Sequence, residues 1–333
     1  MKRPRVVGLV GSLIVSLLVG CTSANPSASP TERLTVGLGY LPSVQFAQFY
    51  RAQRQGYYAA AGLEVTFEHR FDYDILALVG EGTLDAGMSD GTSVIAAAGQ
   101  GYPVQYAASI YARFPSVVYS ATDSGIATAA DLRGKRIGIP GRFGSSWIML
   151  QALLASADLS PDDAEIVLYP DFGQAVALRE GQVDAATGFA NNEPVQLGRA
   201  GFPVSVLAID DITPLPGPGL TVGDETLAQR GPTLRAFVAA TLRAMREIEV
   251  DPILGLEDAI ATVPELGSDR QGQLAVLRAT IEMWRTPYTL EHGLGALDAA
   301  AWSRSIDFMR TLPDLEVPTD MTANQLLTEE LLP

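Results

Sequence analysis

A short phrase occurs twice in this chain, and the repeat restricts the possible folds more than any other feature. It reads EGTLDAG at Glu81–Gly87 and EGQVDAA at Glu180–Ala186. In both places a helical pattern precedes Glu-Gly, and a run of small residues typical of a strand begins at Asp-Ala. Glycine adopts the backbone angles that end a helix, so each phrase predicts the same helix-to-strand turn. Chance repetition in an Ala- and Gly-rich chain is the alternative, and the matching context favours two lobes built from one βαβ element.

Strand and helix patterns alternate around both phrases. Alternating strand patterns at Leu34–Leu38 and Leu63–Glu68 flank a helical stretch, and a second series of the same kind follows residue 129. This order is typical of α/β units, in which parallel strands are covered by helices. Beyond Glu225 the pattern is almost wholly helical, so too few strands remain for a third lobe.

The fold class that we expect is therefore α/β, with two lobes and a ligand cleft between them. The helices at the C-terminus, interrupted at Pro264, Pro287 and Pro313, would return to cover the first lobe. The predicted domains are residues 34–116 with 220–333 for lobe 1, and residues 117–219 for lobe 2.

The N-terminal segment differs from the rest. Three bases precede an apolar run over residues 6–20, which is too short to span a membrane and fits a signal peptide over residues 1–20. Cys21 follows directly in Leu-Val-Gly-Cys and is the only cysteine. This stretch resembles the bacterial lipobox, so we expect Cys21 to carry lipid; an inert Cys is the alternative. Residues 21–33 would then be the lipidated Cys and a Ser/Pro/Ala-rich linker.

Composition excludes several classes of function. The chain has 38 acidic and 23 basic residues, a net charge of −15, and no basic stripe, so nucleic acid is not an expected partner. It also lacks the residue spacings of a Ser-His-Asp triad or of a zinc site. We therefore expect no catalytic residues, no metal and no cofactor.

Several longer motifs resemble one protein family. They are LGYLPSVQFAQFYRAQRQGYYAAAGLEVTFE at Leu38–Glu68, the two Asp-Ala phrases, DLRGKRIGIPG and GFANNEP. Together they resemble the solute-binding proteins of bacterial ABC importers, in the group that binds thiamine pyrimidine, nitrate and alkanesulfonates. The resemblance implies a periplasmic-binding-protein-like fold, an ABC permease and its ATPase as partners, and a lipid-anchored position outside the cytoplasmic membrane.

The ligand of such a protein lies beyond the carboxyl ends of strands, where loops and helix N-termini converge. Pyrimidine-binding members carry a first loop resembling Leu-Asp-Trp-x-Pro-Asn-x-x-His, whose Asp, Asn and His are replaced here by Gly39, Ser43 and Phe46. Aromatic residues recur in the other loops, which favours a wider flat heterocycle, as in the riboflavin-binding members. The candidate ligand-binding residues are Tyr40, Ser43, Phe46, Asp90, Thr92, Tyr111, Phe114, Arg142, Phe143, Ser145, Trp147, Phe189, Asn191, Asn192 and Glu193.

Alternatives stay open at these positions. Half of the aromatic residues could belong to the core, and Asp90-Gly91-Thr92 could be a helix cap. Arg142 beside a Gly-rich turn keeps nitrate or an alkanesulfonate possible, and the thiamine pyrimidine precursor is a further candidate. An exported enzyme resembling the fungal pyrimidine synthase is the remotest candidate. That enzyme uses a His, a Lys-bound cofactor and a Cys-rich motif, whereas this chain has two His and two Lys residues.

Overall fold

The computed structural model describes residues 1–2, 31–70, 72–312 and 315–333. Residues 3–20 of the predicted signal peptide and Cys21 lie outside these described residues, as does most of the linker. Thr31–Pro333 form one unit. Among the described helices, none is long and apolar enough to cross a membrane.

The first sheet has five strands in the order β2-β1-β3-β10-β4. β1 pairs in parallel with β2 and β3, whereas β10 is antiparallel to β3 and β4. In β2 the buried Leu63 and Val65 alternate with the exposed Glu64 and Thr66, which is why this stretch forms a strand with one covered face. The strands are β1 Glu32–Leu38, β2 Leu63–His69, β3 Ala86–Asp90, β4 Val104–Ser109 and β10 Pro218–Gly223.

The second sheet repeats this arrangement with other segments, in the order β7-β6-β8-β5-β9. β6 pairs in parallel with β7 and β8, and β5 is antiparallel to β8 and β9. We refer to the parts of the chain built on the first and second sheets as lobe 1 and lobe 2. The strands are β5 Ser116–Ala121, β6 Arg136–Ile139, β7 Glu165–Leu168, β8 Ala185–Phe189 and β9 Val204–Ala208.

The chain passes between the two sheets twice. It leaves the first sheet after β4 and enters the second at β5; it returns after β9 and adds β10 to the first sheet. Each antiparallel strand is thus the one that comes directly from the other sheet. The segments between β4 and β5 and between β9 and β10 are the two connections. The lobe boundaries near residues 116 and 220 stay predictions. The sequence further predicts a hinge at Ser116–Val118 and Pro214–Gly219, which also stays a prediction.

The repeated phrase has a structural explanation. In each copy Gly follows the helix with a positive φ, 73° at Gly82 and 72° at Gly181, and the Asp stands directly before the next strand, as predicted. The carboxylate of Asp85 accepts a hydrogen bond from the backbone N–H of Thr35 at 2.7 Å. Asp184 accepts one from the N–H of Arg136 at 2.9 Å. Each Asp therefore ties its turn to the neighbouring parallel strand.

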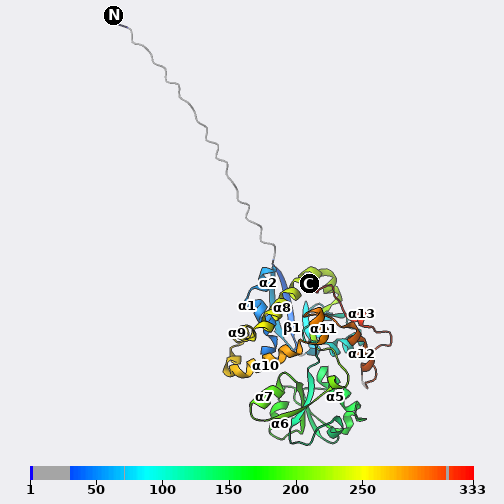
Figure 1. Cartoon of the computed structure of the whole chain (residues 1–333). Helices are drawn as coiled ribbons and strands as arrows, with labels where there is room; N and C mark the ends of the chain where they lie inside the picture. The colour runs from blue at the N-terminus through cyan, green and yellow to red at the C-terminus, as the bar shows by residue number, and fades with distance from the viewer. Residues whose placement is uncertain (3–30, 71, 313–314) are drawn as a thin grey trace. The chain divides into compact units, whose positions relative to one another are not determined.

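Helices cover both sheets, as Figure 1 shows with α1, α2, α8 and α9 around one half and α5, α6 and α7 around the other. Their apolar faces fill the core between helix and sheet. Up to β9 the helices are α1 Ala47–Arg54, α2 Tyr57–Ala60, α3 Asp72–Gly80, α4 Gly91–Gly99, α5 Gly144–Ala155, α6 Gln174–Arg179 and α7 Glu193–Arg199. Short 3-10 helices are η1 Val44–Phe46, η2 Ala129–Leu132, η3 Pro161–Asp163, η4 Ile209–Asp211 and η5 Pro264–Asp269.

The C-terminal part is helical, as the sequence predicts, and two of the three predicted prolines mark element starts. η5 begins at Pro264 and α11 at Pro287, while Pro313 lies outside the described residues. α8 packs on α1 and β10, and α13 on β4; α10 also contacts α7 of lobe 2. The helices are α8 Asp224–Val250, α9 Pro252–Thr262, α10 Arg270–Met283, α11 Pro287–His292, α12 Ala299–Met309 and α13 Ala323–Leu326.

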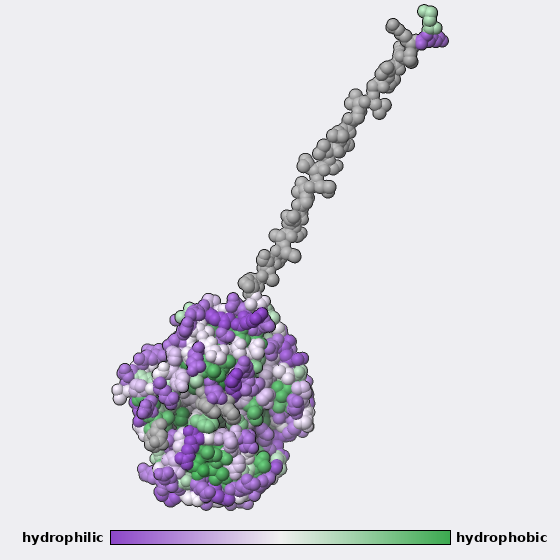
Figure 2. Space-filling model, turned by 180° about the vertical axis from the view of Figure 1, so that it is seen from behind, coloured by the Kyte–Doolittle hydropathy of each residue, from purple (hydrophilic) through white to green (hydrophobic). Residues whose placement is uncertain are grey.

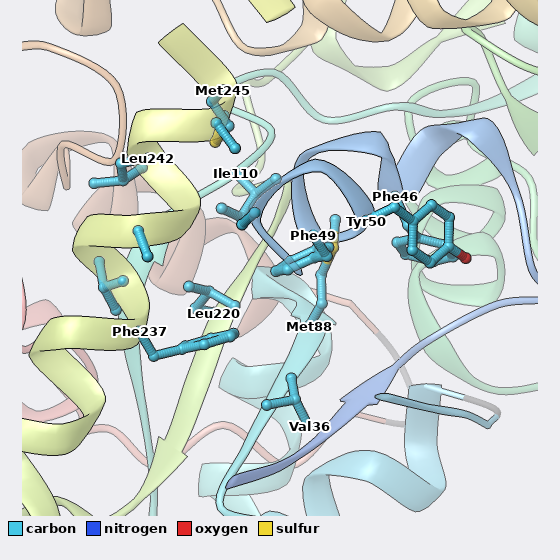
Figure 3. Packing of buried hydrophobic residues seen from close by; sticks show 14 of the residues in the cluster. Val36, Phe46, Phe49, Tyr50, Met88, Ile110, Leu220, Phe237, Leu242 and Met245 are labelled. Atoms are coloured by element: carbon cyan, nitrogen blue, oxygen red, sulfur yellow. The ribbon is translucent and has the colours of Figure 1, made fainter. Parts of the chain in front are cut away.

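The core of lobe 1 lies between β1, β3 and β10 on one side and α1 with α8 on the other. Figure 3 shows Phe49 of α1 close to Phe237 of α8, and the two rings stack with centroids 6.3 Å apart. The surface in Figure 2 is mostly polar, with apolar patches between. Exposed apolar residues of lobe 2 include Leu168, Val176 and Val206.

Candidate functional site

A cavity lies where the carboxyl ends of parallel strands from both sheets meet. Lobe 1 contributes residues after β1 and at the end of β3, and lobe 2 contributes residues after β6 and β7 and at the end of β8. Tyr111, just after β4, and Pro218, at the start of β10, complete the lining beside the connections. Open α/β sheets bind ligands at this edge, so the topology itself makes the cavity the candidate site.

Six of the described residues that line the cavity are aromatic. Tyr40 follows β1 in lobe 1, and Phe172 follows β7 in lobe 2; their rings meet edge to face with centroids 4.9 Å apart. Phe172 has a φ of 61°, a left-handed conformation that is strained for a bulky side chain. Such strain collects at binding sites, where the surrounding structure holds it. The aromatic lining residues are Tyr40, Phe46, Tyr111, Phe143, Phe172 and Phe189.

A histidine, His69, contacts the backbone of the loop that carries Tyr40. Nδ1 of His69 lies 2.8 Å from the carbonyl oxygen of Tyr40, and its Nε2 lies 3.2 Å from the hydroxyl of Tyr50. Burial lowers the pKa of His69, partly opposed by this backbone hydrogen bond. His69 is not among the lining residues, so its role is to position the Tyr40 loop.

Three helix N-termini point their first residues toward the cavity. Asp90 is the N-cap residue of α4, Gly144–Ser146 begin α5, and Glu193 begins α7. All of these residues line the cavity. Free N–H groups at a helix start suit negatively charged or carbonyl groups. Here the starts of α4 and α7 carry carboxylates that belong to the chain itself.

Glu193 is the most constrained of these groups. Its carboxylate accepts a hydrogen bond from the N–H of Phe189 at 2.8 Å and one from Nδ2 of Asn192 at 3.0 Å. Burial raises the pKa of Glu193, and the backbone hydrogen bonds only partly oppose this. The pKa of Tyr40 is also raised, first by burial and then by the nearby charge of Glu193. A partly buried carboxylate and a phenol thus share one side of the cavity.

Two further polar side chains line the cavity with unused hydrogen-bonding capacity. Ser89 and Gln174 are 0% and 2% exposed. Nε2 of Gln174 donates to the carbonyl of Thr187 at 3.0 Å, which fixes the amide. The hydroxyl of Ser89 and Oε1 of Gln174 have no hydrogen-bond partner among the described residues. Buried polar atoms are rarely left unpaired. Both atoms are shielded in this structure, so a polar group of a ligand could reach them only after the groups around them move.

Nine of the predicted ligand-binding residues line the cavity together. A ring, a hydroxyl, an amide or a carboxylate is presented by each of them. They are Tyr40, Phe46, Asp90, Tyr111, Phe143, Ser145, Phe189, Asn192 and Glu193.

Three other predicted residues lie behind the lining. Ser43 is the N-cap of η1 and accepts a hydrogen bond from the N–H of Gln45, so it shapes the loop instead of facing the cavity. Thr92 is fully buried within the first turn of α4, and Phe114 packs in the apolar cluster that both sheets share. A residue close to the end of a strand therefore does not always line the cavity.

Arg142 and Trp147 interact with each other outside the lining. The guanidinium of Arg142 lies 5.3 Å from the centre of the Trp147 ring, and Trp147 packs in the core at 8% exposure. Trp147, a candidate ligand-binding residue by sequence, thus lies away from the cavity lining in this structure. Trp147 lies about one turn after the start of α5. The start of the helix faces the cavity, whereas the Trp147 side chain points into the core of lobe 2.

Asn191 connects the lobes behind the cavity. It lies between β8 and α7 and is fully buried. Its Nδ2 donates to Oε1 of Gln45 at 3.0 Å and to Oγ1 of Thr280 in α10 at 2.8 Å, and lies 3.4 Å from the hydroxyl of Tyr111. Asn191 is thus a contact between lobe 2 and elements packed on lobe 1.

Sequence reasoning missed several lining residues. Gln45, Met88, Ser89, Gln174 and Pro218 all line the cavity. Ser89 precedes Asp90 at a strand end, which is a signal that could have been used. Gln174 begins a helix after an irregular segment, and no local pattern distinguishes it. In the described part of the chain, no group of three or more His, Cys, Asp or Glu residues could hold a metal ion.

Comparison with known sequences adds three findings. A model of the family described as NMT1/THI5 like matches residues 43–253. The riboflavin-binding protein RibY of Chloroflexus aurantiacus is 35% identical to the chain over 352 residues, which cover 100% of this chain and 99% of that one. The 4-amino-5-hydroxymethyl-2-methylpyrimidine phosphate synthase of Schizosaccharomyces pombe is 28% identical over 255 residues, 72% of each chain.

Solved structures with the same fold include the alkanesulfonate-binding protein SsuA of Xanthomonas axonopodis pv. citri bound to MOPS. The TM-score is 0.65 at 18% sequence identity, and the match covers 87% of this chain and 97% of that one. At this identity the likeness concerns the fold alone. It agrees with the predicted periplasmic-binding-protein-like architecture.

Proposed function

The chain belongs to the NMT1/THI5-like family, and we propose that it is an extracytoplasmic solute-binding protein of an ABC importer. The two-sheet fold with a cavity at the meeting strand ends supports this role, because such a protein needs two lobes, connections and a binding cleft. Its partners are the permease and ATPase of the importer. The role requires no catalytic group, and His69 supports a loop instead of facing the cavity.

Riboflavin is the ligand that we propose first. The observation that carries this proposal is the lining itself, in which six aromatic residues come from both lobes and none of the described lining residues is Lys, Arg or His. A flat, neutral heterocycle can stack on the rings, while polar atoms at its edge meet Ser89, Gln174 and Glu193. A relative aligned over its full length and named as a riboflavin-binding protein supports the same choice.

The pyrimidine precursor of thiamine is the second candidate. Its amino group could donate to Asp90 or Glu193, and a pyrimidine phosphate synthase is among the similar proteins. Nitrate and alkanesulfonates come last, because the only base predicted at the site, Arg142, lies outside the lining. A buried anion without a cationic partner is strongly unfavourable.

Titration of the purified protein tests the proposal. Riboflavin, the aminopyrimidine alcohol, nitrate and taurine are added separately, with flavin fluorescence and calorimetric heat as readouts. We expect riboflavin fluorescence to be quenched at micromolar protein, with no heat from nitrate or taurine. Clear heat from another compound together with unchanged flavin fluorescence would reject riboflavin and leave the importer role standing.

We also propose that Cys21 is lipidated after cleavage of residues 1–20. The support is the Leu-Val-Gly-Cys sequence after an apolar run. Several acyl chains on one residue give stable anchoring where one chain does not. In the bacterial host, Cys21→Ala should leave the protein soluble or unprocessed, as cell fractionation would show. A mature variant that still fractionates with membranes would mean that the anchor lies elsewhere.

A further inference from the structure

The carboxylates at the helix starts have a consequence for ligand choice. In α/β folds the start of a helix is a ready site for phosphate or sulfonate, because its N–H groups and dipole favour negative charge. Two of the three starts at this cavity carry an acidic residue of the chain, Asp90 as the N-cap residue of α4 and Glu193 as the first residue of α7. α5 has no acidic residue at its N-cap or in its first turn.

The carboxylate of Glu193 is held at the cavity by the end of a strand. It accepts a hydrogen bond from the N–H of Phe189, the last residue of β8. Asp90 is 7% exposed and lies at the end of β3, in the opposite lobe. The described lining of the cavity therefore includes one acidic residue from each lobe and contains no Lys, Arg or His.

The remaining polar atoms of the cavity suit a neutral ligand. Oε1 of Gln174 can only accept a hydrogen bond, and its amide is held by Thr187. The hydroxyl of Ser89 can donate or accept. Both residues are more than nine-tenths buried, and both atoms have no partner among the described residues. A ligand that brings N–H and O–H donors satisfies these acceptors, whereas a phosphate group brings mainly further acceptors.

We propose that Asp90 and Glu193 make this cleft select the unphosphorylated form of its ligand and reject the phosphate ester. The inference rests on the proposed function and names riboflavin and its 5′-phosphate, FMN, as the two compounds to be distinguished. A phosphate monoester carries about −1.5 to −2 charges at neutral pH. Bringing that charge into a cavity with two carboxylates adds repulsion in a poorly solvated place, where charges interact more strongly than in water. Such rejection of a competitor is a common source of specificity.

The test compares riboflavin with FMN by fluorescence titration in the wild-type protein and in four variants. Asp90→Asn and Glu193→Gln, made singly and as a double variant, keep the size of each side chain and remove its charge. Asp224→Asn is the matched control, because Asp224 also begins a helix but follows β10 at the opposite edge of the first sheet. Melting curves of all variants confirm folding.

We expect the wild-type protein and the control to bind FMN at least about tenfold more weakly than riboflavin. Each cleft variant should reduce this ratio at least about threefold, and the double variant should reduce it further. Equal wild-type affinity for the two compounds would overturn the inference and leave the importer role in place. An unchanged ratio in both cleft variants would overturn it too. A wild-type protein that binds no riboflavin would overturn the proposed ligand and this inference with it.

Discussion

Tyr40 and Phe172 meet across the cleft, so a ligand between the lobes must contact or displace this ring pair. We expect Tyr40→Ala and Phe172→Ala each to weaken riboflavin binding several-fold, because a lost aromatic contact removes about 0.5–1.5 kcal/mol in addition to buried area. Fluorescence titration measures the change. Tyr102→Ala is the control, since Tyr102 is an exposed ring outside the lining. Equal effects of all three substitutions would argue against a stacking site.

Glu193 makes a second residue-level prediction, on stability and pH. Burial raises the pKa of Glu193 in the folded protein. Below the ordinary carboxyl pKa of about 4.3, Glu193 is protonated in both states and does not penalise folding. As pH rises from there through the raised pKa, the native state loses stability. Glu193→Gln removes this penalty, and its amide oxygen can still accept from Phe189. The melting temperature of the variant minus that of the wild type should therefore increase from pH 4 to pH 8, by about 2–4 °C for each kcal/mol of penalty that is removed. A difference that decreases with rising pH would contradict a raised pKa at Glu193.

Which residues face the ligand was only partly predictable from sequence. Tyr40 and Glu193 could be placed because a strand end or helix start in an α/β fold has a known direction. Trp147 could not, because one turn into a helix the facing side depends on how α5 sits against its own sheet. We now expect Trp147→Ala to act mainly on stability, by about 3–5 kcal/mol as for other buried Trp residues.

The Glu-Gly-x-x-Asp-Ala turn is the element that both lobes share, and Asp184 shows what it contributes. Its carboxylate pairs with the Arg136 side chain at 2.7 Å and accepts from the Arg136 N–H. The side-chain hydrogen bond from Arg136 is the largest cause that lowers the pKa of Asp184. A lowered pKa stabilises the fold above the ordinary value of about 3.9, and this contribution disappears as pH falls through the folded value.

Asp184→Asn should therefore destabilise the protein at pH 7 and much less at pH 3. The pair is over one-third exposed, so screening limits the expected loss to about 1 kcal/mol. Denaturant unfolding at both pH values measures it. Asp123→Asn, in an exposed turn of the same lobe, should change stability by less than about 0.5 kcal/mol. A loss that is equal at both pH values would show that the charge of Asp184 is not what matters.

At the scale of elements the fold was well determined by pattern. The repeated phrase predicted two equivalent turns, and the structure has them at matching places in two sheets of the same strand order. The sheet that β5 and β10 each join was harder to predict from the sequence. β5 and β10 each join the sheet that the chain has just entered, and this choice depends on contacts between distant segments, which local periodicity does not encode.

At the scale of the whole molecule, the cavity is smaller than the ligand that we propose for it. Its volume is about 120 Å³, whereas sites for ligands of cofactor size measure about 300–1,000 Å³. Riboflavin could enter only if the lobes separate, so the contacts between lobes must break and re-form in each binding cycle. Asn191 makes the buried polar contacts of this kind, to Gln45 and Thr280.

Asn191→Ala should shift the free protein toward open conformations. The closed state would lose hydrogen bonds and leave Oε1 of Gln45 buried without this donor, at about 1–3 kcal/mol. A ligand that binds the closed state then binds more weakly, by roughly fivefold to a hundredfold, and mainly through faster dissociation.

Stopped-flow fluorescence measures the dissociation rate, and small-angle X-ray scattering measures the radius of gyration without ligand. Gln182→Ala is the control, because Gln182 lies in an exposed turn of lobe 2 and the nearby Glu180 accepts the hydrogen bond from its side-chain amide. If dissociation and radius of gyration are the same in both variants, closure does not depend on Asn191.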